Sequence, residues 1–155
     1  MNTCRLSLPL FVVLVAVALS FGCNGSRRGI VTYKVSGTVT YNDQPVSNVN
    51  VAFIPVVEEG GERAAAVTNE KGYYQLSSMN SDPGAGAMPG EYRVTLSHKI
   101  QRPGVEPVRD ASGNIIQYDF IEEFPAIYQD VENTPFTVKV VKGRNTFDFP
   151  VTPQK

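Results

Sequence analysis

The sequence predicts an all-β protein, a sandwich of two sheets formed by seven short strands. The first observation is a repeated alternation of apolar and polar residues with a period of two, which is typical of half-buried strands. The second is the Gly, Pro, Asn and Asp content of the intervening stretches, which favours turns. The third is that no window of a dozen residues has the period of an amphipathic helix. Short strands separated by regular turns are typical of sandwich domains.

The clearest strand is expected at residues 32–41, where Val39 is one of several apolar residues that alternate with polar ones such as Thr38. The next strand is expected at residues 49–53, and alternation makes Val51 an inward residue like Val39. The last two strands are expected to pair as a hairpin through the Lys-Gly-Arg-Asn turn between them. The five further strands are expected at residues 64–68, 74–76, 92–96, 136–140 and 147–151.

Residues 1–22 predict a secretory signal peptide. Arg5 and the α-amino group supply positive charge, and residues 6–19 are apolar apart from one Ser and one Pro. This stretch is too short to span the ~30 Å hydrocarbon core of a bilayer comfortably. Gly22 and Cys23 resemble the bacterial lipobox, in which a small residue precedes a cysteine that receives a diacylglycerol before cleavage. The resemblance implies that Cys23 becomes the lipidated N-terminus. The alternative is ordinary cleavage nearby, which leaves a free Cys23.

Residues 23–30 are expected to be the lipidated N-terminus and a short tether, and residues 31–155 a single domain. The expected location is the cell envelope, on a membrane through the lipid, facing the periplasm or the exterior. Cys4 leaves with the signal peptide, so the domain has no cysteine for a disulfide. The mature chain carries thirteen basic and fifteen acidic residues, and this near-neutral balance argues against nucleic acid as a partner.

Residues 98–131 interrupt the rhythm of strands and are expected to form a long loop. A loop of this length in a compact domain is usually functional or partly disordered. Residues 100–114 are polar and rich in turn residues, so we expect them to be mobile. Residues 120–128 are more apolar, so we expect them to fold back over an open edge of the sandwich.

Three blocks of sequence resemble the carboxypeptidase regulatory-like domain. They lie at residues 35–41 with the strand that follows, at residues 68–76, and in the Pro-Gly-Glu-Tyr-Arg-Val stretch at residues 89–94. The resemblance covers residues 33–97 and implies a transthyretin-like, seven-stranded Greek-key β-sandwich of the kind carried by small bacterial lipoproteins. It implies a structural or interaction module rather than an activity. Gly37 falls on the inward face, where we expect its missing side chain to let the facing sheet approach.

The chain has one histidine, His98, and this excludes several kinds of site. The zinc site of carboxypeptidases needs two histidines and a glutamate, and the surroundings of His98 lack metal-ligand spacing. We expect His98 to be an exposed residue at a strand end. Glu122 and Glu123 are adjacent, so on an extended chain they point to opposite faces and do not form a carboxylate pair for glycoside cleavage. No acidic cluster has the spacing of a calcium loop. The sequence therefore predicts no catalytic residue, metal or cofactor.

The expected function is that of a non-catalytic, membrane-anchored envelope lipoprotein that serves as a structural or protein-interaction module. A second hypothesis is a glycan- or peptide-binding lipoprotein that uses the long loop and exposed tyrosines. Tyr73, Tyr118 and Tyr128 are its candidate ligand-binding residues, because aromatic rings can form a platform for a sugar or peptide. Tyr128 equally fits a residue packed beneath the long loop.

Overall fold

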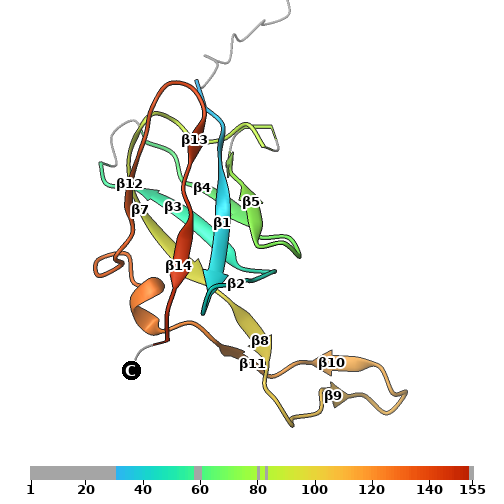
Figure 1. Ribbon diagram of the computed structural model, residues 1–155. Helices are drawn as coiled ribbons and strands as arrows, with labels where there is room; N and C mark the ends of the chain where they lie inside the picture. Colours follow the sequence, from blue (N-terminus) through green and yellow to red (C-terminus); the bar gives the residue numbers. More distant parts are fainter. Residues whose placement is uncertain (1–30, 58–60, 80, 83, 154–155) are drawn as a thin grey trace, which may run out of the picture.

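The computed structural model describes residues 31–57, 61–79, 81–82 and 84–153. The expected signal peptide, Cys23 and the tether lie outside the described residues. In the described part, nearly all regular structure is β, and two five-stranded sheets pack as a sandwich (Figure 1). The predicted all-β sandwich is therefore confirmed.

The first sheet is built around one long strand that pairs along both of its edges. Its strands are β1 (Val35–Tyr41), β2 (Gln44–Pro45), β5 (Tyr73–Gln75), β13 (Asn145–Thr146) and β14 (Phe149–Val151). Along one edge of β1 lie the parallel partners β13 and β14, with Val35 opposite Asn145 and Val39 opposite Phe149. Along the other edge lie the antiparallel partners β5 and β2.

The second sheet is antiparallel throughout. In spatial order its strands are β12 (Thr137–Val140), β7 (Gly90–Ser97), β3 (Asn50–Pro55), β4 (Ala64–Val67) and β6 (Ser77–Ser78). Its central strands, β3 and β7, pair from Asn50 opposite Ser97 to Pro55 opposite Tyr92. Alternate side chains of both strands point between the sheets, as their period of two predicts.

The core lies between the two sheets. Val39 and Val51 are fully buried, as predicted from the alternation, whereas Thr38 is partly exposed. Burying a large apolar side chain stabilises a fold by about 1.5–3 kcal/mol. Phe53 lies at the centre of the core, and its ring centroid is 5.8–6.5 Å from four other rings. Those rings belong to Tyr74, Tyr92, Phe147 and Phe149.

The predicted hairpin between the last two strands is wrong. β12 pairs with β7 in the second sheet, whereas β14 pairs with β1 in the first. The chain crosses between the sheets after Val141, whose main-chain N–H donates to Asn145 Oδ1 at 3.0 Å, while Asn145 Nδ2 donates to the Val141 carbonyl at 2.9 Å. The last strand pairs with β1 instead, because β2 and β5 occupy only one edge of β1 and its other edge accepts β13 and β14 in parallel. Pairing there also brings Phe149 against Phe53 in the core.

Gly37 is buried, but its close neighbour belongs to the same sheet and not to the facing one. A Cβ added to Gly37 would lie 1.8 Å from the main-chain oxygen of Phe147. That carbonyl points inward between β13 and β14 and accepts a hydrogen bond of 2.7 Å from the Tyr74 hydroxyl. The expectation that glycine permits a close approach is correct, and the expected neighbour is wrong.

Residues 98–131 are not one unstructured loop, because they contain four short strands that pair with one another. β8 (Lys99–Gln101) pairs with β11 (Phe120–Glu122), and β9 (Val108–Arg109) pairs with β10 (Ile115–Gln117). These strands and their connections, which we call the arm, extend away from the sandwich (Figure 1). Pairing within the arm satisfies main-chain groups that a bare loop would leave to water.

The chain returns from the arm to the sandwich through a short 3-10 helix, η1 (Ala126–Tyr128). Phe124 and Tyr128 are buried there, with Phe124 5.3 Å from the Tyr41 ring. The expected packing of residues 120–128 against the sheets therefore holds for these two side chains. It does not hold for Phe120, which is 54% exposed on the arm.

Candidate functional site

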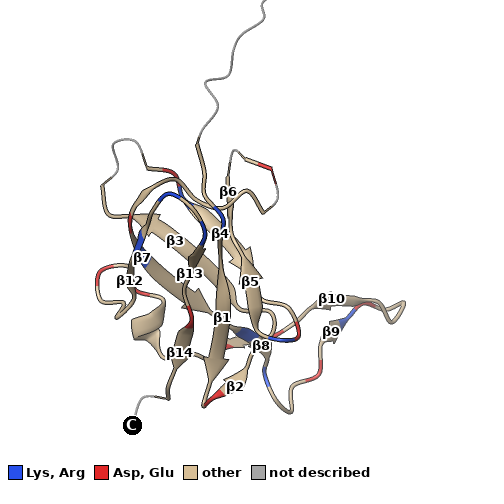
Figure 2. Ribbon diagram, turned by 45° about the horizontal axis from the view of Figure 1, so that its top comes forward, with Lys and Arg blue, Asp and Glu red and all other residues tan. Residues whose placement is uncertain are grey.

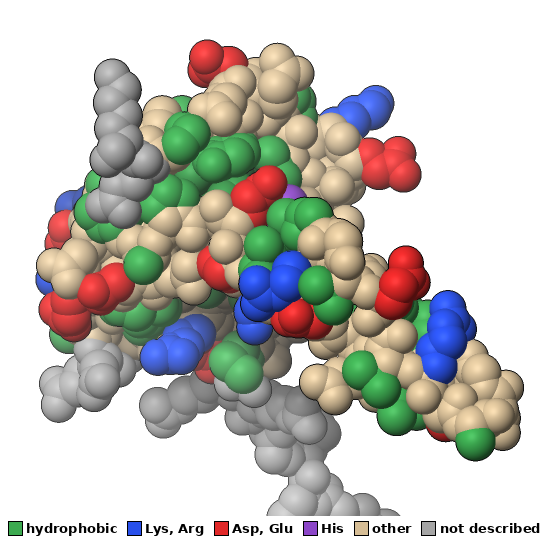
Figure 3. Space-filling model, turned by 90° about the horizontal axis from the view of Figure 1, so that it is seen from below, with side chains coloured by type: hydrophobic (Ala, Val, Ile, Leu, Met, Phe, Trp, Pro, Cys, Tyr) green, Lys and Arg blue, Asp and Glu red, His purple; other side chains and the backbone are tan. Residues whose placement is uncertain are grey.

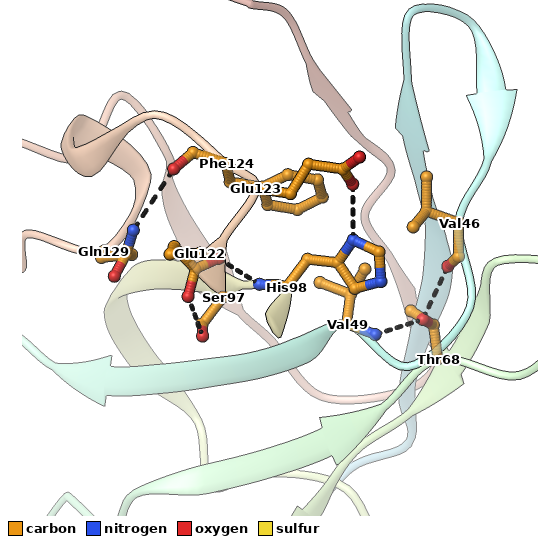
Figure 4. Close-up of polar contacts among 9 residues, drawn as sticks. All are labelled: Val46, Val49, Thr68, Ser97, His98, Glu122, Glu123, Phe124 and Gln129. Carbon is orange, nitrogen blue, oxygen red and sulfur yellow. Dashed lines mark hydrogen bonds and ion pairs between the residues drawn. The ribbon is translucent and has the colours of Figure 1, made fainter. Parts of the chain in front are cut away.

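His98 lies at the base of the arm, between β7 and β8, and its side chain is only 12% exposed. Its Nδ1 is 2.8 Å from Glu123 Oε2, and its ring centroid is 5.5 Å from that of Phe124 (Figure 4). His98 thus lies at a strand end as predicted, but the prediction that it is exposed is wrong. The imidazole is covered by Phe124, which follows the arm in sequence and packs on His98 where the chain returns to the sandwich.

The two adjacent glutamates bind different atoms around His98. Glu122 accepts hydrogen bonds from the His98 main-chain N–H and, at 2.7 Å, from the Ser97 hydroxyl. Glu123 faces the imidazole, and its own main-chain N–H donates to the His98 carbonyl at 2.9 Å. Hydrogen bonds to an ionised carboxylate are stronger than neutral ones. This cluster therefore fixes the direction in which the arm leaves the sandwich.

The same contacts do not form a reactive pair. The Ser97 hydroxyl donates to Glu122 and not to the imidazole, so the geometry differs from that of an activated nucleophile. Among the described residues, no group of three or more His, Cys, Asp and Glu side chains is placed to hold a metal ion. Within the same residues, no helix is long and apolar enough to cross a membrane.

The three candidate tyrosines lie in three different places. Tyr73 is on β5 and is 41% exposed, whereas Tyr118 is on the arm with its ring 5.6 Å from that of Phe120. Tyr128 is buried in η1, stacks at 5.6 Å on Phe136 and has its hydroxyl 3.3 Å from Thr152 Oγ1. The structure therefore does not bring the tyrosines together into one platform.

The arm carries an apolar surface that the sequence interpretation missed. Six of its side chains are exposed and apolar, and Ile116 is the most exposed of them at 63%. Figure 3 shows the arm standing out from the body, with hydrophobic side chains beside charged ones. The sequence signal lay in residues 115–120, which contain two isoleucines and, on either side of Asp119, two aromatic residues. The six residues are Val105, Val108, Ile115, Ile116, Tyr118 and Phe120.

The arm and the start of the described chain lie at opposite ends of the sandwich (Figure 1). The described chain begins at Val31, and Tyr33 forms a β-bridge with Ala87 before β1 starts. The arm leaves the other end, where β7 finishes at Ser97. Charged residues of both signs are scattered over the sandwich and the arm (Figure 2), and Arg102 pairs with Asp119 at 2.7 Å on the arm.

No protein-family model and no curated protein matches the sequence. Among solved structures, the chain is similar to a DUF3823 family protein from Parabacteroides merdae, with 19% identity and a TM-score of 0.39 over 81% of this chain and 48% of that one. It is also similar to the dioxygenase domain of a dioxygenase and carbohydrate-binding fusion from Streptomyces sp. SirexAA-E, with 17% identity and a TM-score of 0.37 over 82% and 83% of the two chains.

A third similar structure is a 9R-lipoxygenase from Cyanothece, with 14% identity and a TM-score of 0.36. The alignment covers 93% of this chain and 20% of the lipoxygenase. The chain thus spans about half of the Parabacteroides protein and a fifth of the lipoxygenase. Likenesses this distant do not bear on activity.

Proposed function

We propose that the protein is a non-catalytic lipoprotein of the cell envelope, held at a membrane through Cys23, whose sandwich presents the arm to a protein partner. The observation that carries the proposal is the position of the arm. Its six exposed apolar side chains lie at the end of the sandwich opposite the start of the described chain. A lipid on Cys23 would be attached eight residues before Val31, and so on the side of the sandwich opposite the arm in the chain's path.

An apolar surface on a projecting arm suits protein recognition. The arm's exposed apolar side chains lie among charged ones (Figure 3), and such a mixture is suited to contact with another protein. The base of the arm is fixed by Glu122, His98 and Phe124, so the arm loses little conformational freedom when it binds. Its two-stranded segments also leave main-chain groups on their edges, which a partner strand could pair with.

The sequence and the site support a binding role rather than catalysis. The blocks at residues 35–41, 68–76 and 89–94 resemble a domain that serves as a structural or interaction module. The single histidine is packed against Phe124 and engaged by Glu123. The polar groups at the base of the arm are thus engaged in holding the arm in place.

Membrane attachment is tested by replacing the lipidated residue. Cys23→Ser should abolish palmitate labelling of the full-length chain and move it from the membrane fraction to the soluble fraction, or leave it unprocessed. Cys4→Ser is the matched control, because Cys4 leaves with the signal peptide, and it should behave as the wild type. Unchanged labelling and partition of Cys23→Ser would contradict the proposal.

The role of the arm is tested with polar substitutions at its surface. Ile116→Ser combined with Phe120→Ser should abolish any larger complex seen on native gels of detergent-extracted membranes. Val67→Ser is the control, because Val67 is 56% exposed but lies on β4 in the sandwich. Neither change removes a buried side chain, so both variants should keep the wild-type melting temperature. Loss of the complex in Val67→Ser alone would place the contact surface elsewhere.

A further inference from the structure

The outer face of the first sheet contains a shallow hollow of about 200 Å³. It is distant in sequence from the arm, and it includes one of the three candidate tyrosines. We call it the Tyr73 hollow. It is lined by Lys34, Ser36, Tyr73, Gln75 and Arg144.

The register of the sheet brings these side chains together. β1 and β5 are antiparallel, with Ser36 opposite Gln75 and Thr38 opposite Tyr73. Because side chains alternate along a strand, Tyr73 and Gln75 point to solvent while Tyr74 between them points into the core. Arg144 arrives from the crossing that precedes β13.

The lining combines an aromatic ring, two cations and two hydrogen-bonding side chains. Lys34 and Arg144 are both exposed, and the lining contains no carboxylate. The nearby Asp148 is engaged by Thr38, whose main-chain N–H and hydroxyl donate to it at 2.8 and 2.7 Å. Gln75 Nε2 donates to the Gly84 carbonyl at 3.0 Å, which fixes the orientation of the amide. The lining of the hollow therefore carries two positive charges and an exposed aromatic ring, and one of its hydrogen-bonding side chains is held in place.

We infer that the Tyr73 hollow binds an acidic sugar unit of a glycan. The apolar face of a pyranose ring can pack on Tyr73, its carboxylate can pair with Lys34 and Arg144, and its hydroxyls can bond Ser36 and Gln75. The hollow is smaller than the roughly 300–1,000 Å³ of pockets that bury a drug-sized ligand. One ring of a longer chain therefore suits it better than a whole compact ligand.

This inference is independent of the arm and of lipidation at Cys23. Neutral sugars would leave both cations without a partner. An acidic peptide could pair with Lys34 and Arg144. It would make fewer contacts with the Gln75 amide and the Tyr73 ring than a sugar ring with several hydroxyls. The chemical class expected is thus an oligosaccharide that contains uronic acid.

The test is calorimetric titration of the full-length chain in mild detergent with tetragalacturonate and with a hyaluronate tetrasaccharide. At least one should bind, and 1 M NaCl should weaken the binding because salt at this concentration screens charge within about 3 Å. Methyl-esterified tetragalacturonate is the matched ligand without charge, and tetraglutamate is the charged ligand without sugar. Both should bind at least fivefold more weakly.

Substitutions in the hollow should act on this binding alone. Tyr73→Ala, Lys34→Ala and Arg144→Ala should each raise the Kd about three- to tenfold, as expected for the loss of one partly exposed contact. Tyr118→Ala and Lys139→Ala are the controls, an exposed tyrosine on the arm and an exposed lysine on β12, and they should leave the Kd unchanged. Circular dichroism melting of each variant shows that it is folded.

Three results would overturn the inference. The first is no binding of either acidic oligosaccharide below millimolar concentration. The second is equal binding of the esterified sugar, which would remove the role of the cations. The third is equal or tighter binding of tetraglutamate, which would make the hollow a site for acidic peptides.

Discussion

The main-chain carbonyl of Phe147 lies against Gly37 and accepts the hydrogen bond from Tyr74. Burial raises the pKa of the Tyr74 hydroxyl above its usual range, so this hydroxyl remains protonated and a donor throughout the neutral range. The alternation of residues 32–41 was enough to place Gly37 on the buried side. It could not identify Phe147 as the neighbour, because that contact depends on pairing between strands more than a hundred residues apart.

Gly37→Ala should strongly destabilise the protein. The new Cβ would meet Phe147 O at 1.8 Å, and the main chain would have to shift to relieve the clash. We expect a loss of about 3 kcal/mol in the free energy of unfolding, at the upper end for overpacking. Tyr74→Phe removes only the donor and should cost about 1–2 kcal/mol. Urea denaturation measures both, and a wild-type midpoint for Gly37→Ala would contradict the geometry.

Val39→Ala and Val51→Ala should each lower the free energy of unfolding by about 1–3 kcal/mol, because each removes fully buried methyl groups. Thr38→Ala should cost less. It loses a hydrogen bond to Asp148 at an exposed site but leaves no cavity. Urea titration of the three variants gives the comparison, and equal losses at all three positions would contradict the observed register.

At the scale of elements, the structure has a strand that overlaps each of the seven ranges predicted from the alternation. The alternation did not predict that β12 and β14 enter different sheets. An alternating strand can pair equally well with a neighbour in either sheet, so alternation does not identify the partner. It also did not predict the arm, whose strands are only two or three residues long and too short to show a period. His98 appeared exposed in sequence because Phe124, which packs on its ring, is separated from it by the whole arm.

The arm should be the first part of the protein that trypsin cuts. Arg109 is exposed on it, whereas Phe124 is buried at its return. Arg102 is also exposed, but it precedes Pro103, and trypsin does not cut before proline. Glu122→Ala removes the acceptor for Ser97 and for the His98 N–H, so cleavage at Arg109 should become several times faster. The melting temperature of the sandwich should change little. Mass spectrometry of timed digests gives the order of cuts, and early cleavage at Lys139 instead would contradict this account.

The turn at the tip of the arm should open in acid. Hydrogen bonds from the Asn114 side chain and main chain hold the pKa of Asp110 below its usual value. A carboxyl whose pKa is lowered on folding stabilises the fold above its unfolded pKa of about 3.9 and loses this effect as pH falls through the folded value. The Asn114 amide resonance should therefore shift below about pH 3.9. Asp110→Asn keeps an acceptor, and its Asn114 resonance should be insensitive to this pH change.

At the scale of the whole molecule, the sandwich separates two surfaces. The Tyr73 hollow lies on the outer face of the first sheet, and the arm extends from one end. The composition and the single histidine were enough to exclude several kinds of catalytic and metal site from the sequence. The positions of the hollow and the arm relative to each other follow only from the fold. Each can therefore be altered without touching the core between the sheets.

The domain should fold without metal. No cysteine follows Cys23, and the buried aliphatic and aromatic side chains form one continuous core. A chelator such as EDTA should leave the melting temperature unchanged in differential scanning calorimetry. A fall of several degrees that added calcium or zinc reverses would reveal a metal site and contradict this prediction.

The most direct test of the central claim, that the arm is the contact surface of a membrane-anchored module, is photo-crosslinking in intact cells. A benzophenone side chain is placed at Ile116 or Phe120 of the full-length chain, or at Val67 as an equally exposed position on the sandwich. The account predicts one discrete crosslinked product in the membrane fraction from Ile116 and Phe120, and none from Val67. A product from Val67 with none from either arm position would contradict it.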